Sequence, residues 1–503
     1  MTGMSATARL SSAAGRWILL ATVLGSGVAM LDATVVNVAL PRIAKDLGAS
    51  MSGLQWTVNA YTLTLAGFIL LGGSLGDRFG RRRMFVIGVI WFAAASALCG
   101  AAQNIPMLIA ARALQGVGGA LLTPGSLAII QASFVPDDRA RAVGAWSGLG
   151  GVAGAVGPFL GGGLVETAGW RWVFLLNVPL AAVVVPVALR HVPESRDEDA
   201  HGRFDVLGAV LAVVALAGVT YALTEAPSAT TSPALVIVAA VAGIATGAAF
   251  VLVERRRSGG RGPQPMLPLG VFASRQFSAV NTVTFVVYGG MGVMFFLLVL
   301  DLQQVAGYSP IVAGTALLPV TILMLLLSAR AGGLAQRIGP RLPMTAGLLL
   351  AATGMLLLTR IGPHASYVRD VLPAVTIFAL GLAGVVAPLT ATVLATADVR
   401  HAGVASGVNN AVARAAGLLA VAAIPPLAGL TGDAYNDPGA FASGFRTAMV
   451  VSAGLLIAGA VLTYFTVRDD VLRTAPGPSE PECKIHCAVG APPLEPDRSP
   501  RAA

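Results

Sequence analysis

The stretch GSLGDRFGRRR at residues 73–83 places Asp77 among four arginines, between two long apolar runs. A similar stretch, GGLAQRIGPR at residues 332–341, aligns with it without gaps at an offset of 259 positions. A repeat at a fixed offset indicates a structure that is built twice. Because apolar runs flank both copies, we interpret them as equivalent loops in two halves of a membrane protein, a plan typical of secondary transporters.

The composition also indicates a membrane protein. Hydrophobic residues make up 55% of the 503 residues and charged residues only 11%, whereas roughly 25% of a soluble globular protein is charged. The 60 glycines are tolerated in membrane helices that pack closely. A soluble chain with so few charges could not cover its own core, so the bilayer must act as the solvent.

A membrane-spanning helix needs about 20 mainly apolar residues, and the sequence contains fourteen such runs. They lie at 17–40, 55–75, 84–102, 106–131, 143–165, 171–190, 206–224, 234–253, 277–300, 311–329, 342–361, 371–395, 403–427 and 441–466. This order predicts an all-α polytopic fold of two six-helix bundles with two extra central helices. The expected divisions are a cytoplasmic N-terminus at 1–16, an N-terminal bundle at 17–190, a two-helix insert with flanking cytoplasmic loops at 191–276, a C-terminal bundle at 277–467 and a disordered cytoplasmic tail at 468–503.

The distribution of basic residues predicts the orientation. With the N-terminus inside, the inner segments hold 25 basic residues and the outer loops hold five. Cytoplasmic loops are enriched in Lys and Arg, so we expect both termini on the cytoplasmic side of the inner (cytoplasmic) membrane. The basic residues lie in short loops rather than in a patch with interleaved aromatics, so the net charge of +9 does not indicate nucleic-acid binding.

No catalytic, metal or cofactor site is expected. Cys483, His486 and Cys487 lie together near the C-terminus, but a structural zinc site needs four ligands and only three are present. None of the five histidines falls in a predicted span, and the chain has no Gly-x-x-x-x-Gly-Lys phosphate-binding loop. These observations disfavour an enzyme and an ATP-driven pump, and they leave the proton gradient as the energy source.

Two opposite charges fall inside the predicted spans at similar depths. Asp32 lies about 12 Å and Arg112 about 9 Å from the outer ends of their runs, at 1.5 Å per residue. Each costs at least ~2.5–3.5 kcal/mol in hydrocarbon unless it has a partner or faces a cavity. We therefore predict that they pair. Structural pairing alone is one interpretation, and proton coupling is the other, because an acid inside a transporter's membrane region is a proton-relay candidate.

The fifth run is rich in glycine. Gly150, Gly154, Gly157 and Gly161 are four, three and four residues apart, so they share one helical face that another helix can approach closely. Pro158 removes a backbone hydrogen bond and bends the helix. Ordinary packing of small residues is the alternative interpretation.

The loop at 73–83 resembles the signature loop of the major facilitator superfamily. The resemblance extends from Trp17 to about Arg468 and implies that family's fold, with the loop as a cytoplasmic gate. The gating residues that it implies are Gly73, Asp77, Arg78, Gly80 and Arg81.

Two more motifs resemble those of this family. Arg112, Gln115 and Gly116 resemble its fourth-helix motif, whose arginine is implicated in proton transfer. The fifth run resembles the antiporter motif, which is found in the family's exporters and is largely missing from its importers. The residues that carry this resemblance are Gly154, Gly157, Pro158, Gly161 and Gly162.

Five stretches resemble signatures of the fourteen-helix drug:proton antiporters. They are LDATVVNVALP at 31–41, WRWVFLLNVP at 170–179, FDVLG at 204–208, LQQVAGYSPIVAGTALLP at 302–319 and GVASGVNNAVARAAG at 403–417. The overall character is closest to antibiotic self-resistance exporters, such as puromycin or methylenomycin exporters, which implies proton-coupled drug efflux by alternating access. Export of an endogenous metabolite or lipid is the alternative. The chain departs from some multidrug relatives because it has no acid deep in the C-terminal bundle, only Asp301 at a helix end.

The expected partners are a small-molecule drug, protons and the lipid bilayer, with the chain acting as a monomer. With Asp32 as the one carboxylate well inside the hydrocarbon, we expect one proton to exchange for one monovalent drug cation. Several polar residues are candidates for the substrate pocket, and core packing is an equal alternative for each. These candidates are Asn59, Tyr61, Asn281, Tyr288, Asn409, Asn410 and Arg414.

Overall fold

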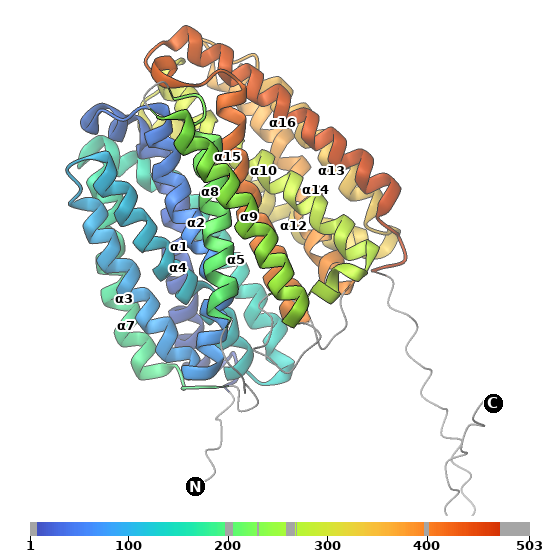
Figure 1. Cartoon of the computed structure of the whole chain (residues 1–503). Helices are drawn as coiled ribbons and strands as arrows, with labels where there is room; N and C mark the ends of the chain where they lie inside the picture. The colour runs from blue at the N-terminus through green and yellow to red at the C-terminus, as the bar shows by residue number, and fades with distance from the viewer. Residues whose placement is uncertain are drawn as a thin grey trace, which may run out of the picture.

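The computed structural model describes residues 8–196, 205–228, 231–257, 267, 269–396 and 402–472. These residues form long helices joined by short turns, and the described ranges contain no β-sheet, only one backbone bridge between Ala8 and Phe134. Figure 1 shows the arrangement. The long helices are α1 (Ala13–Leu47), α2 (Met51–Phe79), α3 (Arg81–Gly100), α4 (Ile105–Ser133), α5 (Pro136–Thr167), α7 (Asn177–His191), α8 (Val206–Glu225), α9 (Pro233–Arg257), α10 (Arg275–Gln304), α12 (Leu318–Ile338), α13 (Arg341–Leu358), α14 (Leu372–Ala395), α15 (Ala402–Leu427) and α16 (Pro438–Thr466). The short elements are α6 (Arg171–Leu175), η1 (Leu269–Ala273), α11 (Pro310–Thr315), η2 (Tyr367–Val371) and η4 (Gly432–Tyr435).

The predicted membrane spans correspond to these helices. Within the described ranges, thirteen helical segments are long and apolar enough to cross a membrane, and they coincide with thirteen of the fourteen predicted runs. The remaining run, 143–165, lies in α5, whose 32 residues extend about 48 Å at 1.5 Å per residue. Three runs consist of two pieces each, namely α6 with α7, α11 with α12, and η2 with α14. The predicted all-α membrane fold is confirmed.

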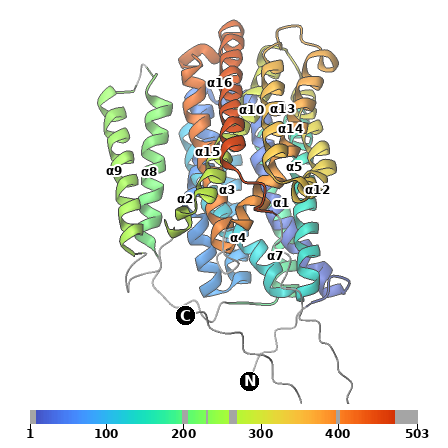
Figure 2. The same cartoon turned by 90° about the vertical axis from the view of Figure 1, so that its right-hand side faces the viewer.

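Helices α1–α7 form one half of the bundle and α10–α16 form the other. The two central helices stand at the side of the bundle (Figure 2). Helix α8 packs against α9 and also against α2 and α15, so the insert contacts one helix of each half. Helices α8 and α9 approach each other closely, because a Cβ on Gly218 would lie 2.6 Å from the carbonyl oxygen of Ala239.

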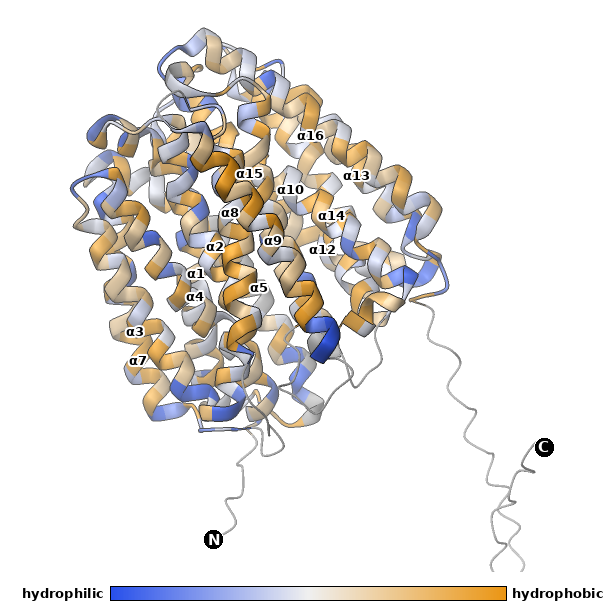
Figure 3. Ribbon diagram, viewed as in Figure 1, coloured by the Kyte–Doolittle hydropathy of each residue, from blue (hydrophilic) through white to orange (hydrophobic). Residues whose placement is uncertain are grey.

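The outer surface of the bundle is apolar, as the hydropathy colouring in Figure 3 shows. On α9, for example, Leu235, Ile237 and Val238 are 51%, 62% and 62% exposed. Large contiguous apolar surfaces are rare on soluble monomers. This surface therefore faces lipid.

The bundle has two ends, which we name by the chain termini. The terminal face holds the beginning of α1 and the end of α16, and the far face is the opposite end (Figure 1). The halves meet at the far face, where the Gln303 side chain donates a hydrogen bond to the Val38 carbonyl at 3.1 Å. Gly162 of α5 also lies against the backbone of Ile311 in α11.

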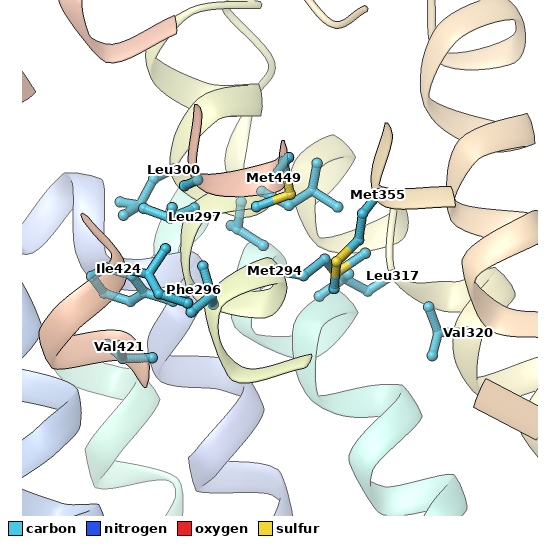
Figure 4. Close-up of a cluster of buried hydrophobic side chains, with 14 of the residues drawn as sticks. Met294, Phe296, Leu297, Leu300, Leu317, Val320, Met355, Val421, Ile424 and Met449 are labelled. Atoms are coloured by element: carbon cyan, nitrogen blue, oxygen red, sulfur yellow. The ribbon is translucent and has the colours of Figure 1, made fainter. Parts of the chain in front are cut away.

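The core of the C-terminal half holds α10 in place. Met294 and Leu297 of α10 point toward Met355 of α13 and Met449 of α16 (Figure 4), and all four side chains are completely buried. Close packing of this kind leaves little freedom for the helix that carries Asp301.

Candidate functional site

A buried ion pair joins α1 to α4. Arg112 Nη1 donates to Asp32 Oδ2 at 2.6 Å, and the two side chains are 1% and 0% exposed. The predicted pairing of the two charges is confirmed. Removing both charges from water is costly, so the pair is stable only where the remaining polar atoms also have partners.

Gln115 supplies part of that support. It lies one turn after Arg112 on the same face of α4. Its Oε1 accepts a hydrogen bond from Arg112 Nη1 at 2.6 Å, and its Nε2 donates to Asp32 Oδ1 at 2.8 Å. Arg112 Nε also donates to the carbonyl of Thr57 on α2 at 3.0 Å. The arginine therefore connects three helices.

Two neutral residues that the sequence analysis missed complete the cluster. Asn177 of α7 donates from Nδ2 to Asp32 Oδ1 at 3.1 Å and to Ser96 Oγ of α3 at 3.2 Å. Gln115 Nε2 donates to the same Ser96 oxygen at 2.7 Å. Asn177 falls within the signature at 170–179, but nothing in that stretch indicates which helix the amide would meet. Ser96 lies in an apolar run with no motif.

Aromatic rings enclose the guanidinium. Arg112 Cζ lies 4.4 Å from the ring centroid of Tyr61 and 5.7 Å from that of Phe174. Such cation–π contacts contribute about 0.5–2 kcal/mol each. Gly116 allows α4 to approach α2 here, because a Cβ on it would lie 2.3 Å from the Tyr61 carbonyl oxygen. The fourth-helix motif thus forms one contact surface, made of Arg112, Gln115 and Gly116.

Asp32 is the acceptor that joins these helices. It accepts three hydrogen bonds, one of them from the charged guanidinium of Arg112. The cluster is therefore the candidate site for the predicted proton coupling.

The predicted gating loop forms a clasp at the terminal face. Gly80 has φ of 110°, which favours glycine, and a Cβ on it would lie 2.6 Å from Glu194 Oε1. The Arg82 backbone N–H donates to that same oxygen at 3.0 Å, and Arg82 Nη1 donates to the Val192 carbonyl at 3.1 Å. The clasp joins the start of α3 to the segment after α7.

The other half repeats the clasp. Gly339 has φ of 92° and lies 259 residues after Gly80. The Arg341 backbone N–H donates to Asp469 Oδ1 at 3.2 Å, and Arg341 Nε donates to the Val467 carbonyl at 2.9 Å. The sequence repeat indicated the two glycines. It did not indicate the two acids, because they come from the segments after the last helix of each half.

The other gating residues lie nearby. Arg81 Nη2 and Nε donate to Asp77 Oδ1 at 2.8 and 2.9 Å, one helical turn apart. Gly73 faces α4, where a Cβ would lie 3.7 Å from Pro124 Cβ. Arg78 is exposed, and its Cζ lies 5.9 Å from the ring of the adjacent Phe79.

The glycines of the fifth run contact different partners. A Cβ on Gly157 would lie 2.1 Å from Thr34 Oγ1, and one on Gly161 would lie 2.8 Å from Val35 Cγ1, so both face α1. Gly162 instead faces α11 of the other half, and the carbonyl oxygen of Pro158 would lie 2.2 Å from a Cβ on Gly314 of α11.

Gly154 behaves differently from the other glycines of the motif. A Cβ on it would meet no described atom within 4 Å. It therefore lies outside the packed surface that Gly157 and Gly161 form with α1.

The pocket candidates do not form a single group. Asn409 Nδ2 of α15 donates to Asn281 Oδ1 at 3.2 Å and to Thr284 Oγ1 at 2.7 Å, so these residues join α15 to α10. Asn410 is exposed and Arg414 is partly buried.

The remaining candidates lie apart from that pair. Asn59 is 1% exposed, and neither of its amide atoms has a hydrogen-bond partner among the described residues. Tyr61 belongs to the Arg112 cluster. The Tyr288 carbonyl on α10 lies 3.8 Å from where a Cβ on Gly417 of α15 would be.

Asp301 lies at a helix end, as expected, three residues before the end of α10 at Gln304. Its side chain is nevertheless 0% exposed, and neither carboxylate oxygen accepts a hydrogen bond from the described part of the chain. Nothing in the sequence indicated this burial, because the acid itself ends the apolar run by which that helix was located.

The insert is fastened at the terminal face by an ionic group. Asp205 caps α8 by accepting a hydrogen bond from Gly208 N–H at 2.6 Å, and it also accepts one from Arg257 at the end of α9. Glu254 Oε2 accepts a hydrogen bond from Leu267 N–H at 2.7 Å. Burial alone would raise the pKa of Asp205, but hydrogen bonds with Glu254, Arg257 and Gly208 hold that pKa below its ordinary value.

No group of three or more His, Cys, Asp or Glu residues that could hold a metal ion occurs within the described ranges. Cys483, His486 and Cys487 lie outside those ranges.

Comparison with known proteins identifies the family. Residues 22–421 match the Major Facilitator Superfamily, and the chain belongs to this family of membrane transporters. The predicted fold and the resemblance of the chain to this family are thereby confirmed.

Similar proteins are antibiotic-resistance proteins. The puromycin resistance protein pur8 of Streptomyces alboniger is 39% identical over 389 residues, which cover 75% of this chain and 75% of that protein. The methylenomycin A resistance protein of Bacillus subtilis is 40% identical over 316 residues, or 62% of this chain and 65% of that protein. The multidrug resistance protein Stp of Mycobacterium tuberculosis is 38% identical over 372 residues, or 73% and 66%. The matches thus span about two thirds to three quarters of these relatives.

Solved structures share the fold at low identity. A peptide transporter POT in complex with sulfate has a TM-score of 0.66 at 14% identity, covering 92% of this chain and 98% of that one. A bacterial homolog to the human lysosomal transporter Spinster, in an inward-facing and unoccupied conformation, has a TM-score of 0.62 at 19% identity, with coverages of 93% and 100%.

Proposed function

We propose that this chain exports a drug-like small molecule across the cytoplasmic membrane in exchange for protons. The observation that carries the proposal is the fully buried Asp32–Arg112 pair, with further hydrogen bonds to Asp32 from Gln115 and Asn177. Relatives named for resistance to puromycin, methylenomycin A and multiple drugs support the drug-export part.

The proposed cycle uses alternating access between the two halves. The terminal face carries most of the basic residues and is cytoplasmic by the positive-inside rule. Contacts of α1 with α10 and of α5 with α11 close the far face, and α2 also touches α15 at Leu70 and Gly407. In the proposed cycle the substrate enters this conformation from the terminal face. Protonation of Asp32 from outside releases Arg112, and loss of the proton inside restores the pair.

The glycine face of α5 supports this cycle. Gly157 and Gly161 bring α5 against α1, which carries Asp32, while Gly162 brings the same helix against α11. A change at Asp32 can therefore reach the contact between the halves through one rigid helix. A single copy contains every part of this path, so we propose a monomer as the working unit.

The test is drug susceptibility in a host that lacks its own efflux pumps. We expect the wild-type chain to raise the tolerated concentration of at least one of puromycin, methylenomycin A and tetracenomycin C. Asp32→Asn should abolish that resistance at equal membrane abundance, and a protonophore should abolish drug uptake into inverted vesicles. Glu166→Gln, which changes an exposed acid at the end of α5, is the matched control and should retain resistance.

Two outcomes would contradict the proposal. Full resistance in Asp32→Asn would remove Asp32 from proton coupling. Absence of resistance to any of the compounds, together with loss of a secreted metabolite when the gene is deleted, would favour export of an endogenous compound.

A further inference from the structure

Asp301 is a buried acid that the proposed cycle does not use. It lies on α10, three residues before the end of the helix, with a fully buried side chain. Neither Oδ1 nor Oδ2 accepts a hydrogen bond from any described residue. Asp32, by contrast, has three donors. The two acids therefore have opposite surroundings.

An isolated carboxylate is poorly suited to such a position. A charge that is taken out of water needs a counter-ion or hydrogen-bond donors, and without them the group is neutralised instead. For a carboxyl group, neutralisation means binding a proton. The environment of Asp301 therefore fits a carboxylic acid.

The charged groups on the surrounding helices do not provide a close counter-ion. Among the elements packed against α10, the helices α11, α14 and η1 carry no charged residue. Arg446 on α16 acts on Asp301 electrostatically, but it is exposed, and no hydrogen bond or ion pair joins the two in the described structure. Arg414 on α15 is level with Tyr288, which is roughly 20 Å from Asp301 along the helix at 1.5 Å per residue.

The remaining neighbour is α1, whose charges near Asp301 lie at the far face. Arg42 of α1 pairs with Asp46 at 3.2 Å. Arg42 and Lys45 line a cavity of about 370 Å³ between the halves, together with Gln304 and Tyr435. Gln304 follows Asp301 by one turn of α10, and its Nε2 donates to the Tyr435 carbonyl at 3.0 Å. The cavity therefore begins one helical turn from the buried acid.

We propose that Asp301 is a second proton-binding site, in the C-terminal half, which exchanges its proton with the far side of the membrane through the cavity beside Gln304 and Tyr435. The inference rests on the proposed proton coupling and extends it. In this closed conformation the proton is retained. When the far face opens, Arg42 and Lys45 of α1 move away from Gln304 and Tyr435, and water reaches the carboxyl group through the wider cavity.

A proton that enters from the far side and is held while the far face is closed does not add to the protons that cross the membrane. It changes instead the charge of the C-terminal half, which is neutral at Asp301 in the closed conformation and can ionise there only when the far face is open.

The test measures the protonated acid directly and needs no drug. The full-length protein in lipid is titrated from acidic to alkaline pH while infrared spectroscopy follows the carbonyl stretch of a protonated carboxylic acid. We expect the wild type to show this band at neutral pH, where exposed acids are ionised, and to lose it at high pH. The band should shift in deuterated buffer, because the proton exchanges with water.

Two variants identify the acid. Asp301→Asn keeps the shape of the side chain and should diminish the band, whereas Glu166→Gln should leave it in place. The part that remains in Asp301→Asn belongs to Glu254 at the terminal face, because burial raises the pKa of that carboxyl group to about 7. A parallel count of protons released during the titration should be lower by about one per protein molecule in Asp301→Asn.

Several results would overturn the inference. They are absence of the band in the wild type, an undiminished band in Asp301→Asn, and a band that neither titrates nor exchanges in deuterated buffer. Because none of these readouts involves a drug, they are independent of the susceptibility test. A chain that exports none of the tested compounds would still give a clear answer on Asp301.

Discussion

The contact between Gly162 and α11 allows a quantitative test of how the halves move. A Cβ on Gly162 would lie 2.5 Å from Ile311 Cα, 2.7 Å from the Pro310 carbonyl oxygen and 2.9 Å from Ile311 N. All three are backbone atoms, so no side chain can rotate away. Ordinary contact begins at 3.4 Å, and Gly162→Ala therefore requires the halves to separate by about 0.9 Å at this point.

Overpacking of this kind costs about 1–3 kcal/mol. The cost applies where α5 and α11 touch, which is the conformation with the far face closed. It does not apply once the far face opens. Alanine should therefore shift the equilibrium toward the open far face by about 5- to 150-fold, with little effect on folding.

The assay is electron–electron distance measurement between spin labels at Glu166 and Asn436, two exposed positions of opposite halves near the far face. Cys483 and Cys487 are replaced by serine, and Cys99 is completely buried. Gly162→Ala should increase the longer-distance population. Gly163→Ala is the matched control, since a Cβ there meets no described atom within 4 Å, and it should match the parent. Identical distance distributions for the two variants would refute the reasoning.

Three further changes test other parts of the structure. Arg112→Lys should fail to restore proton-driven export although the charge remains, because lysine lacks the planar fork that reaches several acceptors at once; normal export in the vesicle assay would show that charge alone suffices. Gly80→Ala should lower the free energy of unfolding by about 1–3 kcal/mol, because φ of 110° is strained for alanine and Glu194 occupies the space for its Cβ. An unchanged unfolding temperature would show that the clasp is not rigid. Asp205→Ala removes the cap of α8 and should cost about 0.5–2 kcal/mol. The folded-state pKa of Asp205 lies below its ordinary value. The carboxylate therefore stabilises the protein near neutral pH, and this contribution is lost as the pH falls through the folded-state pKa. Unfolding scans in which wild type and variant differ equally at all pH values would contradict this.

The fold was predictable because lipid imposes simple rules on the sequence. The lengths of the apolar runs located the helices, and the repeated loop indicated the two halves. The Asp32–Arg112 pair was predictable for the same reason, since two isolated charges at one depth have few other solutions in hydrocarbon.

The supporting residues could not be predicted in this way. Ser96 and Asn177 are neutral, so an apolar run tolerates them without a visible signal, and their role depends on how α3 and α7 rotate toward α1. Glu194 and Asp469 lie in segments that resemble any charged loop. Asp301 was placed correctly at a helix end, but its burial was not predicted, because hydropathy falls at an acid whether or not other elements cover that acid.

The two halves share a backbone plan but differ in their buried acids. At the repeat offset of 259 residues, Asp32 corresponds to Met291 and Asp301 corresponds to Arg42, so neither acid has a counterpart. Duplication therefore accounts for the helices and the clasps, but not for the two acids. Their surroundings imply different responses to a proton. Asp32 must break an ion pair to bind one, which moves helices, while Asp301 has no partner to release and loses its proton only while the far face is open. It follows that neutralising Asp32 should alter the balance between conformations at neutral pH, and that neutralising Asp301 should leave that balance in place at neutral pH.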